Sequence, residues 1–196
     1  MGIAKWGIRA GRAIGKDPNK KGDFGEMIVA SIFDPRFFGD EEHYLVNNLI
    51  IETSDGITHQ IDHVVIYKTG IFCIETKNIK GRIVGDNESE QWLNYRGNRQ
   101  FFIYNPILQN RTHVKVLNAF LESNYDIQSV VVFTNSNKPN GLYDYVLNLE
   151  ELRGYIKNYK PSKELSSSEM KEAFKALDSY KESCVISRRE HVENIK

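Results

Sequence analysis

Three ionisable side chains interrupt two stretches of the sequence that are otherwise typical of buried β-strands. Asp62 lies in the β-branched run 59–67, and Glu75 and Lys77 lie in the run 71–77. A charge that is buried without a partner is unfavourable, so these side chains must compensate one another or share a ligand. The fold must therefore bring the two runs together with their charges on a common face.

The segment that separates the two runs is typical of a hairpin turn. Side chains alternate along a strand, so Glu75 and Lys77 share a face. If a turn with an even number of residues is centred just before Gly70, Asp62 pairs with Lys77 and lies diagonal to Glu75, with about 7 to 8 Å between Cα atoms. An odd turn would place Asp62 on the opposite face and separate the carboxylates.

This cluster of charges has two interpretations. Two converging carboxylates are a usual ligand set for Mg²⁺, which combines one or two carboxylates with phosphate oxygens. Lys77 could then orient or deprotonate a water and stabilise the charge that develops during attack on phosphorus. The alternative is a buried ion pair without chemistry, because structural ion pairs also lie in sheets. The residues alone leave both interpretations open.

Four short segments, in a fixed order along the chain, carry a family resemblance. They are Gly25-Glu26, Ile61-Asp62-His63, Ile74-Glu75-Thr76-Lys77-Asn78, and Asn105-Pro106 followed by Gln109-Asn110-Arg111 and His113, with Trp92 before the last. Together they resemble the nuclease-related domain (NERD), which looks like a branch of the PD-(D/E)xK nuclease superfamily. The resemblance covers about residues 21–121 and, more weakly, the strand 130–133. Ile61 stands where the superfamily's name has proline, as it does in other NERD-like sequences.

The resemblance implies a fold, an activity and a set of site residues. The fold is an α/β three-layer sandwich with a central mixed β-sheet and a restriction-endonuclease-like αβββαβ core. The activity is Mg²⁺- or Mn²⁺-dependent hydrolysis of phosphodiester bonds in nucleic acid, with DNA as the expected substrate. Asp62 and Glu75 correspond to metal ligands, Lys77 to the catalytic lysine, and Glu26 to an acidic residue of the first helix that completes the metal shell.

Glu26 also has a structural alternative. It follows Asp23 at the spacing of a capping box, in which its carboxylate would accept a hydrogen bond from the Asp23 backbone N–H. One rotamer cannot fill both roles. Position alone favours the cap, and the family resemblance favours the metal role.

The segment after Asn105-Pro106 predicts a helix whose polar start faces inward. Proline suits the first helical position, and Gln109 and His113 are one turn apart on the same side. We assign Gln109 to substrate binding or support of the site, and His113 to substrate binding; an internal hydrogen bond to the sheet is the alternative for Gln109. His63 alternates to the face opposite Asp62 and is interpreted as a hydrogen-bonded core residue.

A second hairpin is predicted over 92–102, around Gly97-Asn98. Arginine suits phosphate and aromatic rings suit base stacking, so Arg96 and Arg99 at the tip are candidate substrate-binding residues. Trp92 and Phe102 on the stem are instead expected to pack the hairpin onto the sheet.

The remaining pattern gives an order of helix, three strands, helix, strand and helix. A first helix is expected to follow an Asp23 cap, with Phe24, Ile28 and Ile32 as its apolar stripe. This order independently predicts an α/β sandwich. We expect three parts: a basic N-terminal arm (1–21), the nuclease-like domain (22–160) and a C-terminal helical appendage (161–196).

Composition excludes some classes of protein. The 26 Lys and Arg balance 26 Asp and Glu, which argues against binding nucleic acid by overall charge alone. No run approaches the roughly 18 to 20 apolar residues of a membrane span, and residues 1–13 lack the apolar stretch of a secretory signal. Cys73 and Cys184 form neither a metal quartet nor a disulfide framework, which favours a reducing, cytoplasmic location.

Other functions remain open on this sequence. A catalytically inactive nuclease-like module that binds nucleic acid or protein is one, and the balanced charge supports it because many DNA enzymes are more basic. A purely structural ion pair is another. A homodimer is suggested by analogy with nucleases that cut both strands.

Overall fold

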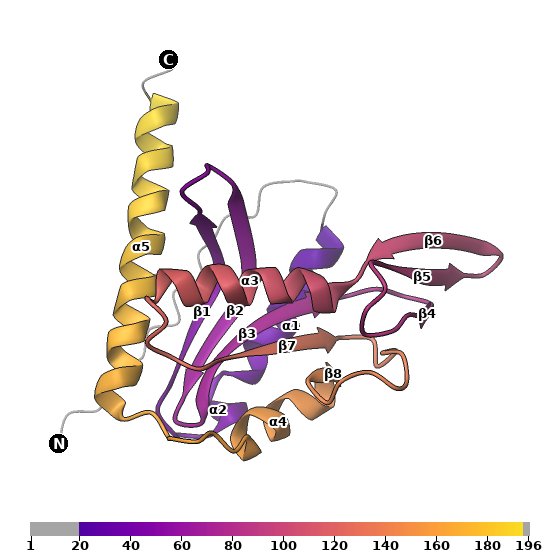
Figure 1. Cartoon of the computed structure of the whole chain (residues 1–196), viewed down its shortest axis with the longest axis horizontal. Coiled ribbons are helices and arrows are strands. Elements are labelled where there is room, and N and C mark those ends of the chain that lie inside the picture. Colours follow the sequence, from indigo (N-terminus) through magenta and orange to yellow (C-terminus); the bar gives the residue numbers. More distant parts are fainter. Residues whose placement is uncertain (1–19, 194–196) are drawn as a thin grey trace.

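The computed structural model describes residues 20–193, in which a mixed five-stranded sheet lies between two layers of helices (Figure 1). Its strand order is β1-β2-β3-β7-β8. The bounds are β1 His43–Glu52, β2 Thr58–Tyr67, β3 Gly70–Lys77, β7 Ile127–Phe133 and β8 Val146–Asn148. β1, β2 and β3 pair antiparallel, whereas β7 pairs parallel with both β3 and β8. The predicted α/β sandwich with a central mixed sheet is confirmed.

Helices cover both faces of this sheet. One apolar core joins the sheet to α1 (Lys20–Ile32), α2 (Pro35–Phe38) and α4 (Leu152–Asn158), which follows a short 3₁₀ turn, Leu149–Glu151. The other core joins it to α3 (Pro106–Phe120) and to α5 (Ser167–Glu193). The β-branched runs of the central strands are thus buried on both sides, as continuous apolar strands require.

A separate three-stranded sheet is inserted between β3 and α3. It consists of β4 (Arg82–Val84), β5 (Gln91–Arg96) and β6 (Arg99–Tyr104), and it extends beyond the end of the central sheet (Figure 1). Trp92 anchors it, because its ring is buried and stacks on Phe133 of β7. The β5–β6 hairpin was predicted, but β4, β8 and α2 are too short to show a periodic pattern.

The turn between β2 and β3 lies one residue earlier than the sequence predicted. Tyr67 pairs with Gly70, and the ladder ends at the pair of His63 and Ile74. The turn still contains an even number of residues, so the alternation of side chains along both strands is the predicted one.

This shift changes the neighbour of Asp62. The predicted pairing of Asp62 with Lys77 is wrong, because the observed register, continued by one pair, places Asp62 opposite Glu75. The two carboxylates are therefore closer to directly opposed than to diagonal. An error of one residue in the turn centre moves every pair by two residues, which preserves the face but not the partner.

Helix α1 begins before the residue that was expected to cap it. It starts at Lys20, so Asp23 lies inside the helix and cannot be its N-cap. The capping-box alternative for Glu26 is thereby removed. Of the predicted apolar stripe, Ile32 packs half-buried against the core, but Phe24 is 54% exposed, and the buried positions are Val29 and Phe33.

Gly25 allows α1 to approach the end of β3. A Cβ atom on Gly25 would lie 2.6 Å from the Cβ of Asn78, the residue that follows β3. Real Cβ atoms do not come this close, and the Cβ of Asn78 cannot rotate away. The glycine therefore sets the distance between α1, which carries Glu26, and the strand that carries Glu75 and Lys77.

Replacing Gly25 by alanine is expected to lower the free energy of unfolding by about 1–2 kcal/mol, because overpacking outweighs the gain in helix propensity. The matched control is Gly154→Ala in α4, where nothing lies within 4 Å of the added Cβ. That variant should gain up to about 1 kcal/mol. Urea unfolding followed by circular dichroism measures both changes, and a stabilised Gly25→Ala protein would contradict the close packing.

Two regional predictions concern the ends of the chain. Of the predicted basic arm (1–21), residues 1–19 lie outside the described residues. The boundaries of the domain (22–160) and the appendage (161–196) stay predictions; α5 contributes Met170, Ala173 and Leu177 to the core beside β1. Within the part of the chain that the structure describes, no helix combines the length and apolarity that a membrane crossing requires.

Candidate active site

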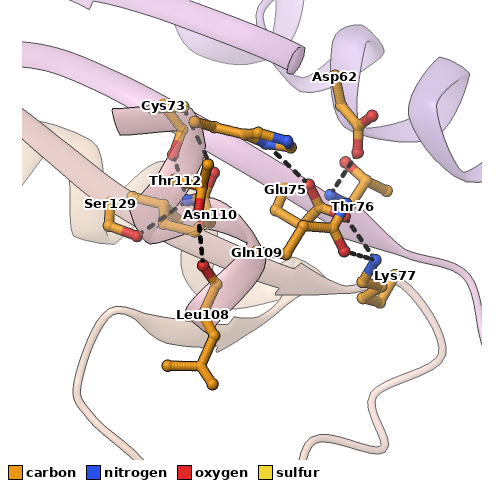
Figure 2. A network of polar contacts seen from close by, with 12 residues as sticks. Asp62, Cys73, Glu75, Thr76, Lys77, Leu108, Gln109, Asn110, Thr112 and Ser129 are labelled. Carbon is orange, nitrogen blue, oxygen red and sulfur yellow. Dashed lines mark hydrogen bonds and ion pairs between the residues drawn. The ribbon is translucent and has the colours of Figure 1, made fainter. Parts of the chain in front are cut away.

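Four of the predicted site residues, Asp62, Glu75, Lys77 and Gln109, meet where β2 and β3 separate, beside the start of α3 (Figure 2). Asp62 comes from β2, Glu75 and Lys77 come from β3, and Gln109 comes from α3. The entry of the helix is as predicted: Asn105 caps it by accepting a hydrogen bond from the Ile107 N–H. Segments that are distant in the sequence thus converge on one group of polar side chains.

The Asp62 carboxylate accepts a backbone hydrogen bond at the point where the β2–β3 ladder ends. It lies just beyond the last β2–β3 pair, and its Oδ2 accepts a hydrogen bond of 2.8 Å from the Thr76 N–H. Burial raises the pKa of the Asp62 carboxyl to about 7, and the charges of Glu75 and Glu26 act in the same direction. The like charges of Glu75 and Glu26 therefore oppose the ionisation of Asp62.

Glu75 is the most enclosed of the acidic groups in the site. It is 2% exposed, and its Oε1 accepts a bond of 2.5 Å from the Lys77 ammonium. Burial raises the pKa of Glu75, but the contacts with His113 and Lys77 outweigh it, so the net pKa is lowered. Glu75 is therefore a carboxylate at neutral pH.

The second oxygen of Glu75 is incompletely satisfied. Its Oε2 lies 3.4 Å from His113 Nδ1, which is a charge contact at the limit of hydrogen bonding. Neither atom makes a well-formed hydrogen bond with the described residues, although both are buried. A buried carboxylate oxygen in this state is suited to receive a further ligand.

Lys77 links the strand to the helix. Its ammonium donates to Glu75 Oε1 and, over 3.0 Å, to Gln109 Oε1. An ammonium has three N–H donors, and described residues engage two of them through these contacts. Gln109 therefore faces the site, as the helix pattern predicted, and it supports Lys77.

His113 lies one turn further along α3 and is almost fully buried. Its ring contacts Glu75 on one side and the half-buried ring of His59 on the other, at 6.4 Å between centroids. Its predicted role in substrate binding stays a prediction. His63 is a core residue as expected: its Nδ1 lies 2.7 Å from Asn47 Oδ1, and burial lowers its pKa to about 4.

The two arginines of the hairpin tip are not part of this group. Arg96 and Arg99 are exposed and pair across the β5–β6 turn, where the Arg96 Nε–H donates to the Lys80 carbonyl oxygen over 3.1 Å. Trp92 packs the hairpin onto the core as expected. Phe102 does not, because it is 68% exposed.

Asn110 has a structural role that the sequence did not reveal. It is fully buried, and its Nδ2 lies within hydrogen-bond distance of three acceptors: Cys73 O, Ser129 Oγ and Val130 O. One side chain thus ties α3 to both β3 and β7. The sequence signal that could have identified it is the position of Asn110, which lies three residues from both Ile107 and His113 on the buried side of the same helix.

The residues present fit a divalent cation in part. Asp62 and Glu75 both lie beside the Lys77 ammonium, and the charges of Glu75 and Glu26 raise the pKa of Asp62. However, within residues 20–193 no three His, Cys, Asp or Glu side chains form a complete metal-ligand group. Mg²⁺ accepts such a partial set, because it keeps waters and substrate oxygens in its shell.

Comparisons with known proteins place this site in context. The family model described as nuclease-related domain, NERD, matches residues 21–134. An uncharacterized protein of Bacillus anthracis is 34% identical over 119 residues, which is 59% of this chain and 54% of that protein. The chain thus spans about half the length of this relative. No solved structure matches. The matched region 21–134 contains every residue of the site described above.

Proposed function

The chain belongs to the nuclease-related domain (NERD) family, and from this premise we propose that it is a metal-dependent nuclease that hydrolyses phosphodiester bonds of nucleic acid, with DNA as its substrate. The observation that carries the proposal is the excess of carboxylate over ammonium at the β2–β3 junction. Burial and two like charges oppose the ionisation of Asp62, and a buried oxygen of Glu75 lacks a hydrogen bond from the described residues. A divalent cation would relieve both.

Asp62 and Glu75, together with Glu26, would hold Mg²⁺ or Mn²⁺. When bound, such an ion neutralises charge on the phosphate and lowers the pKa of a coordinated water. The chain prepares the ligands for this. The Thr76 N–H fixes the Asp62 carboxylate, and Lys77 fixes one oxygen of Glu75 while the other remains available.

Lys77 is the residue that would act directly on the reacting atoms. With two N–H groups held by Glu75 and Gln109, its third can donate to a phosphate oxygen or to the attacking water. In the reaction, a water oxygen forms a bond to phosphorus and the bond to one ester oxygen breaks. The proton that the water loses balances the one that the leaving oxygen gains.

A cleavage assay tests the proposal. The purified protein is incubated with single-stranded, duplex and branched DNA and with RNA, in Mg²⁺, Mn²⁺ or EDTA. We expect cleavage that needs the metal and that Asp62→Asn abolishes. Absence of cleavage from all four substrates in both metals would favour the alternative, a nuclease-like binding module. Equal cleavage by Asp62→Asn would overturn the assignment of the site.

Metal binding should also stabilise the fold. At a hundredfold excess over its dissociation constant, Mn²⁺ should add about 2.7 kcal/mol and raise Tm by about 5–10 °C. Asp62→Asn should lose most of this shift while still accepting the Thr76 hydrogen bond. Asp55→Asn, in the exposed β1–β2 turn, is the matched control and should keep the full shift. Differential scanning calorimetry measures the effect, and an Asp62→Asn protein with the full shift would contradict it.

A further inference from the structure

One side of the three-stranded sheet exposes an unusual set of apolar and aromatic side chains. The strand register aligns Val84, Leu93 and Phe102 in one row across the sheet. Alternation along the strands puts eight residues on this side, which we call the outer face: Arg82, Val84, Gln91, Leu93, Tyr95, Gln100, Phe102 and Tyr104. Phe102 is 68% exposed and Tyr104 is 50% exposed. The opposite side is the one that packs on the core through Trp92 and Ile83.

The charged side chains on the three strands of this sheet are all positive. β4, β5 and β6 carry three arginines and no Asp or Glu, in a chain whose charges otherwise balance. On the outer face the Arg82 guanidinium lies 4.6 Å from the centroid of the Tyr95 ring. The Arg96 guanidinium, 5.5 Å from the centroid of the Phe101 ring, alternates to the opposite side. Within residues 78–105 the acidic residues lie in the β4–β5 loop, at the end of the sheet where Tyr104 pairs with Gln91. Cationic groups thus border exposed rings, which is the composition of surfaces that bind single strands.

The chain connects this face to the proposed active site. It enters the sheet at Arg82, which is five residues after Lys77 and at most about 18 Å away along an extended chain. It leaves through Tyr104 and Asn105, directly before the helix that carries Gln109 (Figure 1). A strand bound along the sheet would therefore lie next to the residues that we propose for cleavage.

We propose that the outer face binds a single-stranded segment of nucleic acid, with bases stacked on Phe102 and Tyr104 and phosphates near Arg82. This inference rests on the proposed function, because it names the form of the substrate at the same site. A regular duplex does not suit the face, since its bases already stack on one another and offer no free ring surface.

Fluorescence anisotropy with a labelled 15-residue oligothymidylate tests the inference. EDTA is present throughout, so that binding is measured without cleavage. Removing a stacking ring reduces affinity about tenfold, so we expect about a hundredfold loss for the double variant Phe102→Ala/Tyr104→Ala. Phe102→Trp should bind as well as the native protein. Phe37→Ala, which removes an equally exposed ring beside Arg36 on α2, is the matched control and should not change binding.

Two further probes separate stacking from charge. An abasic strand of the same length should bind about as weakly to the native protein as oligothymidylate binds to the double variant. A duplex of the same length should show no difference between the native protein and the double variant. Because the two rings are exposed, the double variant should also keep the native Tm.

Several outcomes would overturn the inference. Native affinity of the double variant for oligothymidylate is one. A change in sedimentation of the double variant without loss of binding is another, and would identify the face as a contact between two copies. This result is independent of the proposed function. If the native protein cleaves DNA but the double variant binds with unchanged affinity, the proposed nuclease activity stands and the role of the outer face is wrong. If the rings are needed for binding but the native protein does not cleave, the role of the outer face stands and the nuclease activity is wrong.

Discussion

Replacing Lys77 by methionine is expected to reduce phosphodiester cleavage about a thousandfold while metal binding remains. The ammonium is the cationic group that contacts both Glu75 and Gln109, and removing such a donor from a site of this kind removes stabilisation of the developing charge. It also removes a positive charge that lies beside Asp62 and Glu75. Mn²⁺ should therefore bind the variant at least as tightly as it binds the native protein.

This divergence between cleavage and binding distinguishes a catalytic lysine from a structural one. Single-turnover cleavage and calorimetric titration with Mn²⁺ are measured on the same preparation. The matched control is Lys138→Met, which removes a half-buried lysine paired with Glu151 and should leave cleavage unchanged. If Lys77→Met cleaves at the native rate, or loses cleavage and Mn²⁺ affinity together, the role assigned to Lys77 is wrong.

Replacing Asn110 by leucine is expected to lower the free energy of unfolding by about 3 kcal/mol. The change removes a donor group that three acceptors surround, two of which are backbone carbonyls in the buried centre of the fold. A buried acceptor that loses its partner costs about 1–3 kcal/mol, and leucine recovers part of the loss by apolar burial. Urea unfolding at constant pH measures the difference.

Two companion variants keep this prediction specific to the donor. Asn110→Asp has nearly the same shape but cannot donate when ionised, so it should destabilise at least as much. Asn118→Leu, at a half-buried position of the same helix where the Nδ2 lies 3.4 Å from Ser123 Oγ, should change stability by less than about 1 kcal/mol. A native-like Asn110→Asp protein would show that shape, rather than hydrogen bonding, holds α3 to the sheet.

Local pattern was sufficient to predict the elements that hold the site. The β-branched runs around Asp62 and Glu75 gave the strands and their common face, because side-chain alternation depends only on spacing. The Asn105-Pro106 pair gave the start of α3, because capping is a local interaction. These predictions required no knowledge of what packs against each element.

Most of the errors arose where contacts between residues that are distant in the sequence determine the structure. The centre of the β2–β3 turn depends on how the whole hairpin packs, and three adjacent turn-forming residues left it ambiguous by one position. Phe102 was expected to be buried because aromatic stems usually pack, but Trp92 pairs with Ile103, so alternation puts Phe102 on the other side of the sheet, beside Leu93. The roles of Asn110 and of the His113–Glu75 contact depend on the placement of a helix against a sheet, which spacing alone does not specify.

The insertion between β3 and α3 is separate from the contacts that hold α3 against the central sheet. The contacts that Asn110 makes with β3 and β7 hold the helix in place independently of the excursion from 78 to 105. This inserted segment can therefore change in length or in surface composition without disturbing the residues that we propose for catalysis. We therefore expect related proteins to share the proposed catalytic residues and to differ in the nucleic acids that their inserted sheets bind.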